Sequence, residues 1–130
     1  MGEIEHFVDP LDKSHPRFAS VAGEVLTLFT AENQVGSGKT VDMTAGEASA
    51  TKVVNNETLT YFMTRTQQFL LKAGVNRAGL RFRQHLPSER AHYGASCGCD
   101  CDAAACVAIH ADVVPTCVCL QPRTAGTRKS

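Results

Sequence analysis

Cysteine is distributed so unevenly that it divides the chain in two. All six cysteines lie between residues 97 and 119 of a 130-residue chain, and the first 96 residues contain none. The last 37 residues also lack Phe, Tyr, Trp, Met and Glu and contain a single Leu. Large apolar side chains supply most of the buried surface of a folded core. We therefore expect an ordered domain over residues 1–93 and an irregular or disordered tail over residues 94–130.

Length and composition narrow the class of protein. With 130 residues, 43% hydrophobic and 20% charged, the chain has the size and composition of one globular domain. Thirteen basic residues balance thirteen acidic ones, so any polyanionic partner must be met by a local patch. No stretch approaches the roughly 18 apolar residues of a membrane span, and the N-terminus lacks the basic and apolar regions of a signal peptide. We expect a soluble, intracellular protein that does not contact a membrane.

Hydrophobic periodicity predicts the elements of an α+β fold. Residues 3–8 alternate, with Glu3 and Glu5 on one side, and predict a strand that ends at Asp9. Apolar residues at helical spacing predict a helix over about 17–31, followed by a loop over 33–42. Thr44 and Glu47 have the spacing of a capping box at the start of a short helix.

The strongest helical pattern begins after Asn55 or Asn56, either of which is a suitable N-cap. Lys72 suits the negative end of the helix dipole, and Gly74 suits the position just past the end. Residues 80–83 then alternate apolar and basic side chains as a strand does. The apolar face of this helix is expected to hold Leu59, Phe62, Met63, Thr66 and Leu70.

Two signals invite a chemical interpretation that their spacing does not support. Residues 36–40 (GSGKT) resemble a phosphate-binding loop, but Asn33 stands where the first glycine belongs, and a predicted helix precedes the motif. His85, Glu89 and His92 resemble a metalloprotease signature but lack its order, so structural roles are expected. Neither signal is taken as a site.

The cysteine-rich tail supports a second hypothesis, a small metal-binding or redox module. Thiolates are preferred zinc ligands, and disulfides are unlikely in a reducing compartment. However, the cysteines are spaced as Cys-x-Cys rather than in the usual Cys-x-x-Cys pairs, and alternate residues of an extended chain converge poorly on one metal. Zinc stoichiometry after purification in reducing buffer tests this alternative.

Arginines near the end of the ordered part form a modest basic cluster, at positions 81, 83 and 90. Guanidinium groups suit an RNA backbone or carboxylates such as those of Glu3 and Glu5. Solvated arginines remain the default interpretation.

Three segments together resemble the catalytic core of eukaryotic-type glycyl-tRNA synthetase, a class II aminoacyl-tRNA synthetase. They are residues 1–18 (MGEIEHFVDPLDKSHPRF), 55–62 (NNETLTYF) and 80–93 (LRFRQHLPSERAHY). The resemblance covers residues 1 to about 93, the end of motif 2 and the insertion after it. It implies part of the class II antiparallel sheet with packed helices.

The resemblance also implies a reaction and its participants. In that family the Glu that matches Glu3 binds the amino group of glycine, in a pocket with no space for a side chain. Glycine and ATP, with Mg²⁺, form glycyl adenylate, and the glycyl group passes to tRNA(Gly). The family is homodimeric, makes diadenosine tetraphosphate as a side product, and is cytoplasmic with a mitochondrial pool. Glu5, Arg83, His85, Glu89 and His92 match positions near the site, with structural or unresolved roles.

Family features absent from this sequence lead to further expectations. Motif 1, the ATP-binding strand of motif 2 and motif 3 are missing, so we expect no aminoacylation by the chain alone. The strand over 3–8 is expected to lack its neighbour and the chain to fold weakly. Met1 matches an internal methionine of the family, and the change after residue 93 is what a shifted reading frame gives. A third hypothesis is a non-catalytic interaction protein reusing a synthetase fragment.

Overall fold

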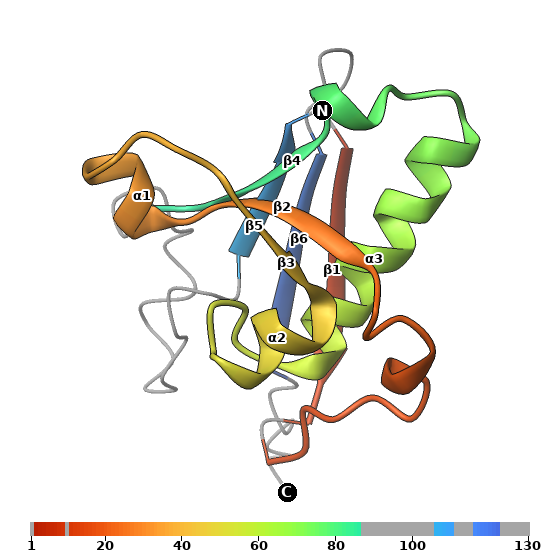
Figure 1. The fold of residues 1–130 in the computed structure, drawn as a ribbon. Coiled ribbons are helices and arrows are strands. Elements are labelled where there is room, and N and C mark those ends of the chain that lie inside the picture. Colours follow the sequence, from red (N-terminus) through yellow and green to blue (C-terminus); the bar gives the residue numbers. More distant parts are fainter. Residues whose placement is uncertain (1, 10, 87–105, 111–115, 123–130) are drawn as a thin grey trace, which may run out of the picture.

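The computed structural model describes residues 2–9, 11–86, 106–110 and 116–122, and it has the expected α+β architecture (Figure 1). Three residues for which the sequence analysis weighed a role, Glu89, Arg90 and His92, lie outside the described residues. The strands are β1 (Gly2–Val8), β2 (Val25–Phe29), β3 (Val41–Thr44), β4 (Arg81–Gln84), β5 (Cys106–His110) and β6 (Thr116–Pro122). The helices are α1 (Ala31–Val35), α2 (Ala45–Ala50) and α3 (Glu57–Lys72), with 3₁₀ turns η1 (Phe18–Ser20) and η2 (Arg77–Gly79).

The strands form one sheet in the order β1-β6-β5-β4-β2-β3. Strand β1 runs parallel to β6, and β2 runs parallel to β4, whereas the other three pairs are antiparallel. The sheet is therefore mixed, whereas the resemblance implied an antiparallel sheet. Parallel pairing of β2 with β4 is possible because the connection between them contains three helices, long enough to return the chain to the same end of the sheet.

Part of the tail also differs from expectation. Two segments of the region predicted to be irregular or disordered, β5 and β6, are strands of the sheet. Branched residues at positions 107, 109, 116 and 118 suit a strand, and β4 offers β5 an edge on which to pair. Strand β1 is consequently paired with β6 along all seven of its residues, contrary to the expectation that it lacks a neighbour. Composition misses such pairing because it depends on an edge formed elsewhere in the chain.

The helix predicted over about 17–31 is wrong. The structure places η1 and then β2 in this region, and α1 begins only at Ala31. Leu26 and Leu28 are buried, while Val25, Thr27 and Phe29 are more exposed, which is the two-residue period of a strand. Apolar residues in this segment fit both the helical spacing of three to four residues and the two-residue spacing of a strand, so the pattern was ambiguous. The β-branched residues Val25 and Thr27 favour the strand. The loop predicted over 33–42 is likewise shortened by α1 and β3.

The caps of the two longer helices are confirmed. The Thr44 hydroxyl accepts a hydrogen bond from the Glu47 N–H at 3.1 Å, and the Glu47 carboxylate accepts one from the Thr44 N–H at 2.9 Å, completing the capping box of α2. Asn56 Oδ1 accepts the Leu59 N–H at 2.9 Å at the start of α3. Past the end of α3, Gly74 has φ +99°, a left-handed conformation that glycine adopts without strain.

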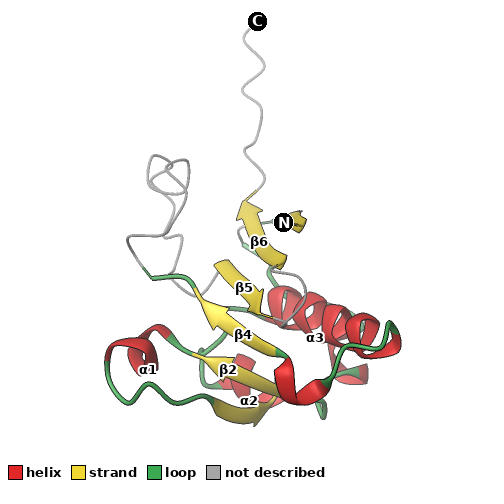
Figure 2. Cartoon of the chain, turned by 90° about the horizontal axis from the view of Figure 1, so that it is seen from above, coloured by secondary structure: helices red, strands yellow, loops and turns green. Residues whose placement is uncertain are grey.

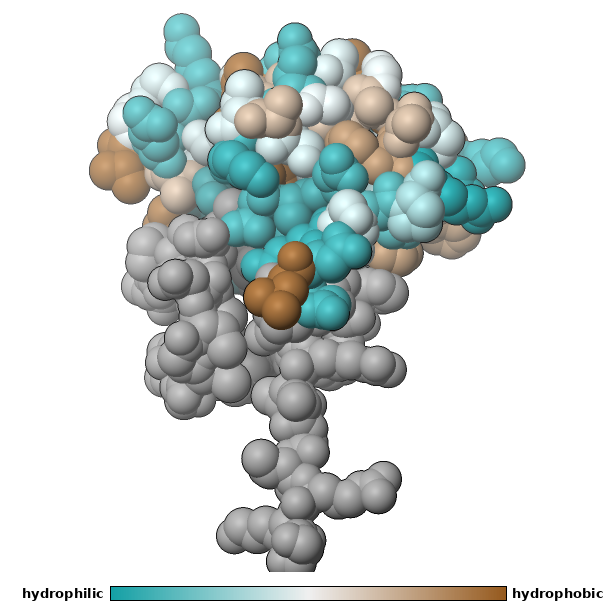
Figure 3. Space-filling model, turned by 90° about the horizontal axis from the view of Figure 1, so that it is seen from below, coloured by the Kyte–Doolittle hydropathy of each residue, from teal (hydrophilic) through white to brown (hydrophobic). Residues whose placement is uncertain are grey.

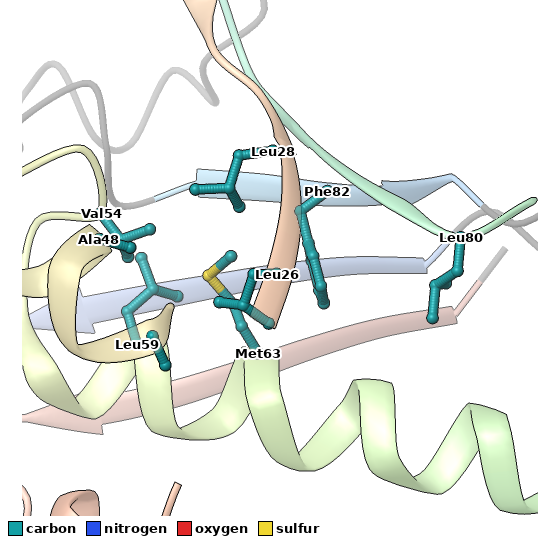
Figure 4. Packing of buried hydrophobic residues seen from close by; sticks show 9 residues of the cluster. Leu26, Leu28, Ala48, Val54, Leu59, Met63, Leu80 and Phe82 are labelled. Carbon is teal, nitrogen blue, oxygen red and sulfur yellow. The ribbon is translucent and has the colours of Figure 1, made fainter. Parts of the chain in front are cut away.

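Helix α3 covers one face of the sheet, and the core lies between them (Figure 2). Leu59 and Met63 of α3 meet Leu26 and Leu28 of β2 and Phe82 of β4 (Figure 4). Burying each such side chain stabilises the fold by about 1.5–3 kcal/mol. The predicted helix face is confirmed at Leu59 and Met63. The other predicted positions on that face, Phe62, Thr66 and Leu70, are only half-buried. Helix α3 instead also buries three polar residues, Thr60, Thr64 and Gln67.

Candidate functional site

The two carboxylate residues singled out in the sequence, Glu3 and Glu5, lie on β1. Their register partners on β6 are Cys117 and Cys119, respectively. Because alternate residues of a strand belong to opposite faces of a sheet, the two glutamates share one face, as the alternation predicted. Ile4, between them, belongs to the other face.

The register across the sheet relates Glu3 to Arg83. Glu3 is paired with Cys117, Cys117 with Ala108, and Ala108 with Arg83 of β4. The four residues therefore form one row on the sheet face opposite the face covered by α3. Three strand spacings of about 4.8 Å separate the backbone at Glu3 from that at Arg83, or ~14 Å. The structure thus places Arg83 and Glu3 in one row of the sheet, three strands apart.

Arg83 is anchored by a polar network that sequence reasoning missed. Its Nη1 donates to Gln34 Oε1 at 2.8 Å. Gln34 Nε2 in turn donates to the carbonyl oxygens of Phe29, at 3.1 Å, and Gln84, at 2.7 Å. Gln34 lies on α1, in a region predicted to be a loop, so no spacing signal marked it. The guanidinium is consequently fixed relative to the ends of β2 and β4.

Neighbouring groups extend this arrangement along β4. Gln84 Oε1 accepts the Ala31 N–H at 2.8 Å, which ties the start of α1 to the end of β4. The Arg81 guanidinium lies 5.2 Å from the centroid of the Phe29 ring, within range of a cation–π interaction. His85 follows β4 and is half-buried. The face opposite α3 therefore carries positive charge at β4.

The segment that follows β1 is docked on the N-terminal part of α3. The Thr58 hydroxyl lies 3.0 Å from both the Lys13 and the Ser14 carbonyl oxygens. The His15 ring stacks on Tyr61 with centroids 3.8 Å apart and planes inclined by 16°. The His15 N–H donates to the Glu57 carboxylate at 3.2 Å. Two of the three family-like segments, residues 1–18 and 55–62, are thereby packed against each other.

Among the residues that the structure describes, no three His, Cys, Asp or Glu side chains are grouped as metal ligands, and the cysteine side chains are not among those described. Among the helices that the structure describes, none has the length and apolar character to cross a membrane. The hypothesis of a cysteine-based metal site stays a prediction.

Curated proteins similar to this chain share one activity in their names. This chain is 52% identical over 98 residues to Glycine--tRNA ligase 1, mitochondrial, of Saccharomyces cerevisiae. The matched region covers 75% of this chain and 14% of that protein. The chain is 54% identical over 97 residues to Glycine--tRNA ligase of Caenorhabditis elegans, covering 75% of this chain and 13% of that protein. Over three quarters of its length, this chain is similar to one part of glycyl-tRNA synthetases. A plant relative, Putative glycine--tRNA ligase, cytoplasmic, of Arabidopsis thaliana, is 44% identical over 98 residues, covering 75% of this chain and 21% of that protein.

The matched region is only a small part of each relative. The chain spans between 13% and 21% of the length of these glycyl-tRNA synthetases. No protein-family profile matches the chain. The resemblance inferred from the three sequence segments is confirmed by the relatives, and it concerns a part of a synthetase.

Proposed function

We propose that residues 1–93 supply part of the catalytic core of a glycine–tRNA ligase, and that residues 94–130 are a separate, non-family tail. The observation that carries this proposal is an identity near one half with glycine--tRNA ligases over three quarters of the chain. The docking of the 11–18 segment on α3 supports it, because it holds together segments that resemble the family at distant positions in the sequence.

Glu3 is the proposed ligand of the substrate glycine. A carboxylate attracts the ammonium group of an amino acid through a charge-assisted hydrogen bond. A carboxylate held close to that ammonium also leaves no space for a side chain, which favours glycine over larger amino acids. Glu5, Arg83, His85, Glu89 and His92 are assigned no catalytic step.

The wider reaction follows from the family. Glycine and ATP, with Mg²⁺, would form glycyl adenylate, and the glycyl group would pass to the terminal ribose of tRNA. The protein contributes mainly by positioning the reactants and by stabilising phosphate charge, without a covalent enzyme intermediate. Homodimer formation and a cytoplasmic or mitochondrial location belong to the same proposal.

A chimeric enzyme tests this function. Residues 1–93 would replace the matching segment of the yeast ligase, and glycine-dependent exchange of pyrophosphate into ATP would be measured. We expect the chimera to support exchange, and the 130-residue chain alone to give none. Glu3→Gln in the chimera should lower kcat/KM for glycine by about tenfold to a hundredfold, the value of a hydrogen bond between charged groups.

The matched control is Glu32→Gln, the same chemical change at an exposed position on α1. It should leave kcat/KM for glycine unchanged. A folded chimera without exchange activity, or equal effects of the two substitutions, would contradict the proposal.

A further inference from the structure

A polar groove of about 450 Å³ lies between the 11–18 segment, α2 and the start of α3. Its lining includes the side chains of Lys13 and Lys52 together with Ser49, Asn56 and Glu57. Figure 3 views the molecule from the side on which α2 and the 11–18 segment lie, and hydrophilic residues prevail over much of the coloured surface. The groove is formed by elements other than β1 and β4, which carry Glu3 and Arg83.

Lys52 is held in an unusual backbone conformation at the edge of this groove. Its φ is +60°, and no other non-glycine residue in the described ranges has a positive φ. Residues with a Cβ rarely adopt this left-handed conformation, and such strain is concentrated at functional positions. Glycine would satisfy the backbone without strain, so the lysine side chain needs another explanation.

The wall of the groove contributed by α2 carries Ser49, a residue that is itself largely buried. Ser49 is only 6% exposed, and the described residues provide no hydrogen-bond partner for its side chain. Asn56, 7% exposed, already uses its side chain to cap the Leu59 N–H and to donate to Asn55 Oδ1. The Ser49 hydroxyl therefore has a hydrogen bond to offer a ligand in the groove.

The charges around the groove favour an anion. The ammonium of Lys52 has only a long contact of 3.4 Å with the Asn55 carbonyl, and neither it nor that of Lys13 forms an ion pair within the described residues. The Glu57 carboxylate is engaged, since it accepts the His15 N–H and lies in the first turn of α3, where the helix dipole offsets its charge. Nearby Asp12 accepts hydrogen bonds from Ser14. Two cations thus remain available to a ligand.

We propose that this groove binds a phosphate group of an RNA backbone, between the ammonium groups of Lys13 and Lys52 and with the Ser49 hydroxyl as an additional donor. Lysine binds phosphate as a flexible point charge, and a chain with no net charge needs such a local patch to meet a polyanion. The identity of the RNA as tRNA rests on the proposed function; the phosphate site itself rests on the groove.

Binding by the intact 130-residue chain tests the site directly. A tRNA(Gly) transcript and inorganic phosphate would be titrated separately while backbone amide resonances are recorded. Both titrations should shift the amides around Lys13, Ser49 and Lys52, and the transcript should bind more tightly. The dissociation constant for the transcript would then be measured over a range of salt concentrations.

Lys52→Gly is the informative variant, because it removes the ammonium and also relieves the left-handed backbone. It should raise the dissociation constant for RNA severalfold and reduce the slope of log K against log[salt] by about one, without lowering the thermal midpoint. The charge-matched control is Lys39→Gln, an exposed lysine outside the groove, which should change neither quantity.

Three results would overturn the site: no shift of these amides, equal effects of the two lysine substitutions, or binding of inorganic phosphate without binding of RNA. Failure of the proposed function is distinguishable, because pyrophosphate exchange by the chimera requires no tRNA. Loss of exchange would contradict the ligase assignment, and loss of RNA binding with exchange intact would contradict the groove alone.

Discussion

The contact between Thr58 and the 11–18 segment offers a direct test of how this fold is held together. Thr58 is 3% exposed, and its hydroxyl is 3.0 Å from the carbonyl oxygens of both Lys13 and Ser14. Thr58→Val preserves the shape of the side chain and its branching at Cβ but removes the donor. We expect this change to loosen the segment that joins β1 to the rest of the domain.

The size of the effect follows from what remains after the substitution. The Lys13 carbonyl still accepts the Thr58 N–H at 3.2 Å, whereas the Ser14 carbonyl loses its contact with this helix. Ser14 is exposed, so water can replace this contact, and the loss is that of an ordinary hydrogen bond, about 0.5–1.5 kcal/mol. We therefore expect the free energy of unfolding to fall by about 1 kcal/mol, a factor of roughly 5 in the equilibrium constant.

Thr66→Val is the matched control, since it makes the same chemical change in the same helix. The Thr66 hydroxyl donates to the Phe62 carbonyl at 2.7 Å, but that carbonyl also lies within the hydrogen-bond ladder of α3. No acceptor is left without a partner, so we expect a change below about 0.5 kcal/mol.

Urea unfolding followed by far-ultraviolet circular dichroism would measure both variants. For Thr58→Val the midpoint should fall with an unchanged m value, and hydrogen exchange at the amides after Lys13 should accelerate. Equal stability of the two variants, or faster exchange confined to α3, would refute the reasoning that this hydroxyl anchors the segment.

Four further outcomes are expected. Asn56→Ala should lower the free energy of unfolding by about 1–2 kcal/mol through loss of the α3 cap, measured by urea unfolding. Phe82→Ala, at a side chain 1% exposed, should lower it by about 3–5 kcal/mol and abolish cooperative thermal unfolding. Lys52→Gly should leave it unchanged or raise it by up to about 1 kcal/mol, because φ is +60° there. Hydrogen bonds from the backbone N–H and, to a smaller degree, the side chain of Thr44 lower the pKa of the Glu47 carboxyl in the folded protein. The carboxylate therefore stabilises the fold above the pKa that Glu47 has in the unfolded chain, and this contribution is lost as the pH falls through the folded pKa. Glu47→Gln should weaken this acid dependence, measured as the urea midpoint against pH.

Elements governed by local chemistry were predictable. The start of α3 was expected from an asparagine cap, its end from Lys72 and Gly74, and α2 from the Thr44 and Glu47 pair. In each case the partners lie within a few residues, so the hydrogen bonds that decide the element are visible in the sequence. The strand of β4 was likewise expected from alternation.

Elements governed by pairing were not predictable in the same way. Residues 25–29 satisfied a helical stripe but became β2, because β3 and β4 supply the hydrogen bonds of a strand on either side. The anchoring of Arg83 by Gln34 and the groove beside Lys52 combine residues from distant parts of the chain. No spacing rule relates such residues before the sheet is assembled.

By itself, the sequence determined the α+β class, the helix caps, the carboxylate strand with Glu3 and the similarity to one part of glycyl-tRNA synthetases. Only the tertiary structure decided that the sheet is mixed, that β1 pairs with β6, and that Glu3 and Arg83 lie in one row of the sheet. The physical reason is the range of the interactions. Caps and side-chain periodicity depend on near neighbours along the chain, whereas strand order and register depend on which edges are available once the core around α3 has formed.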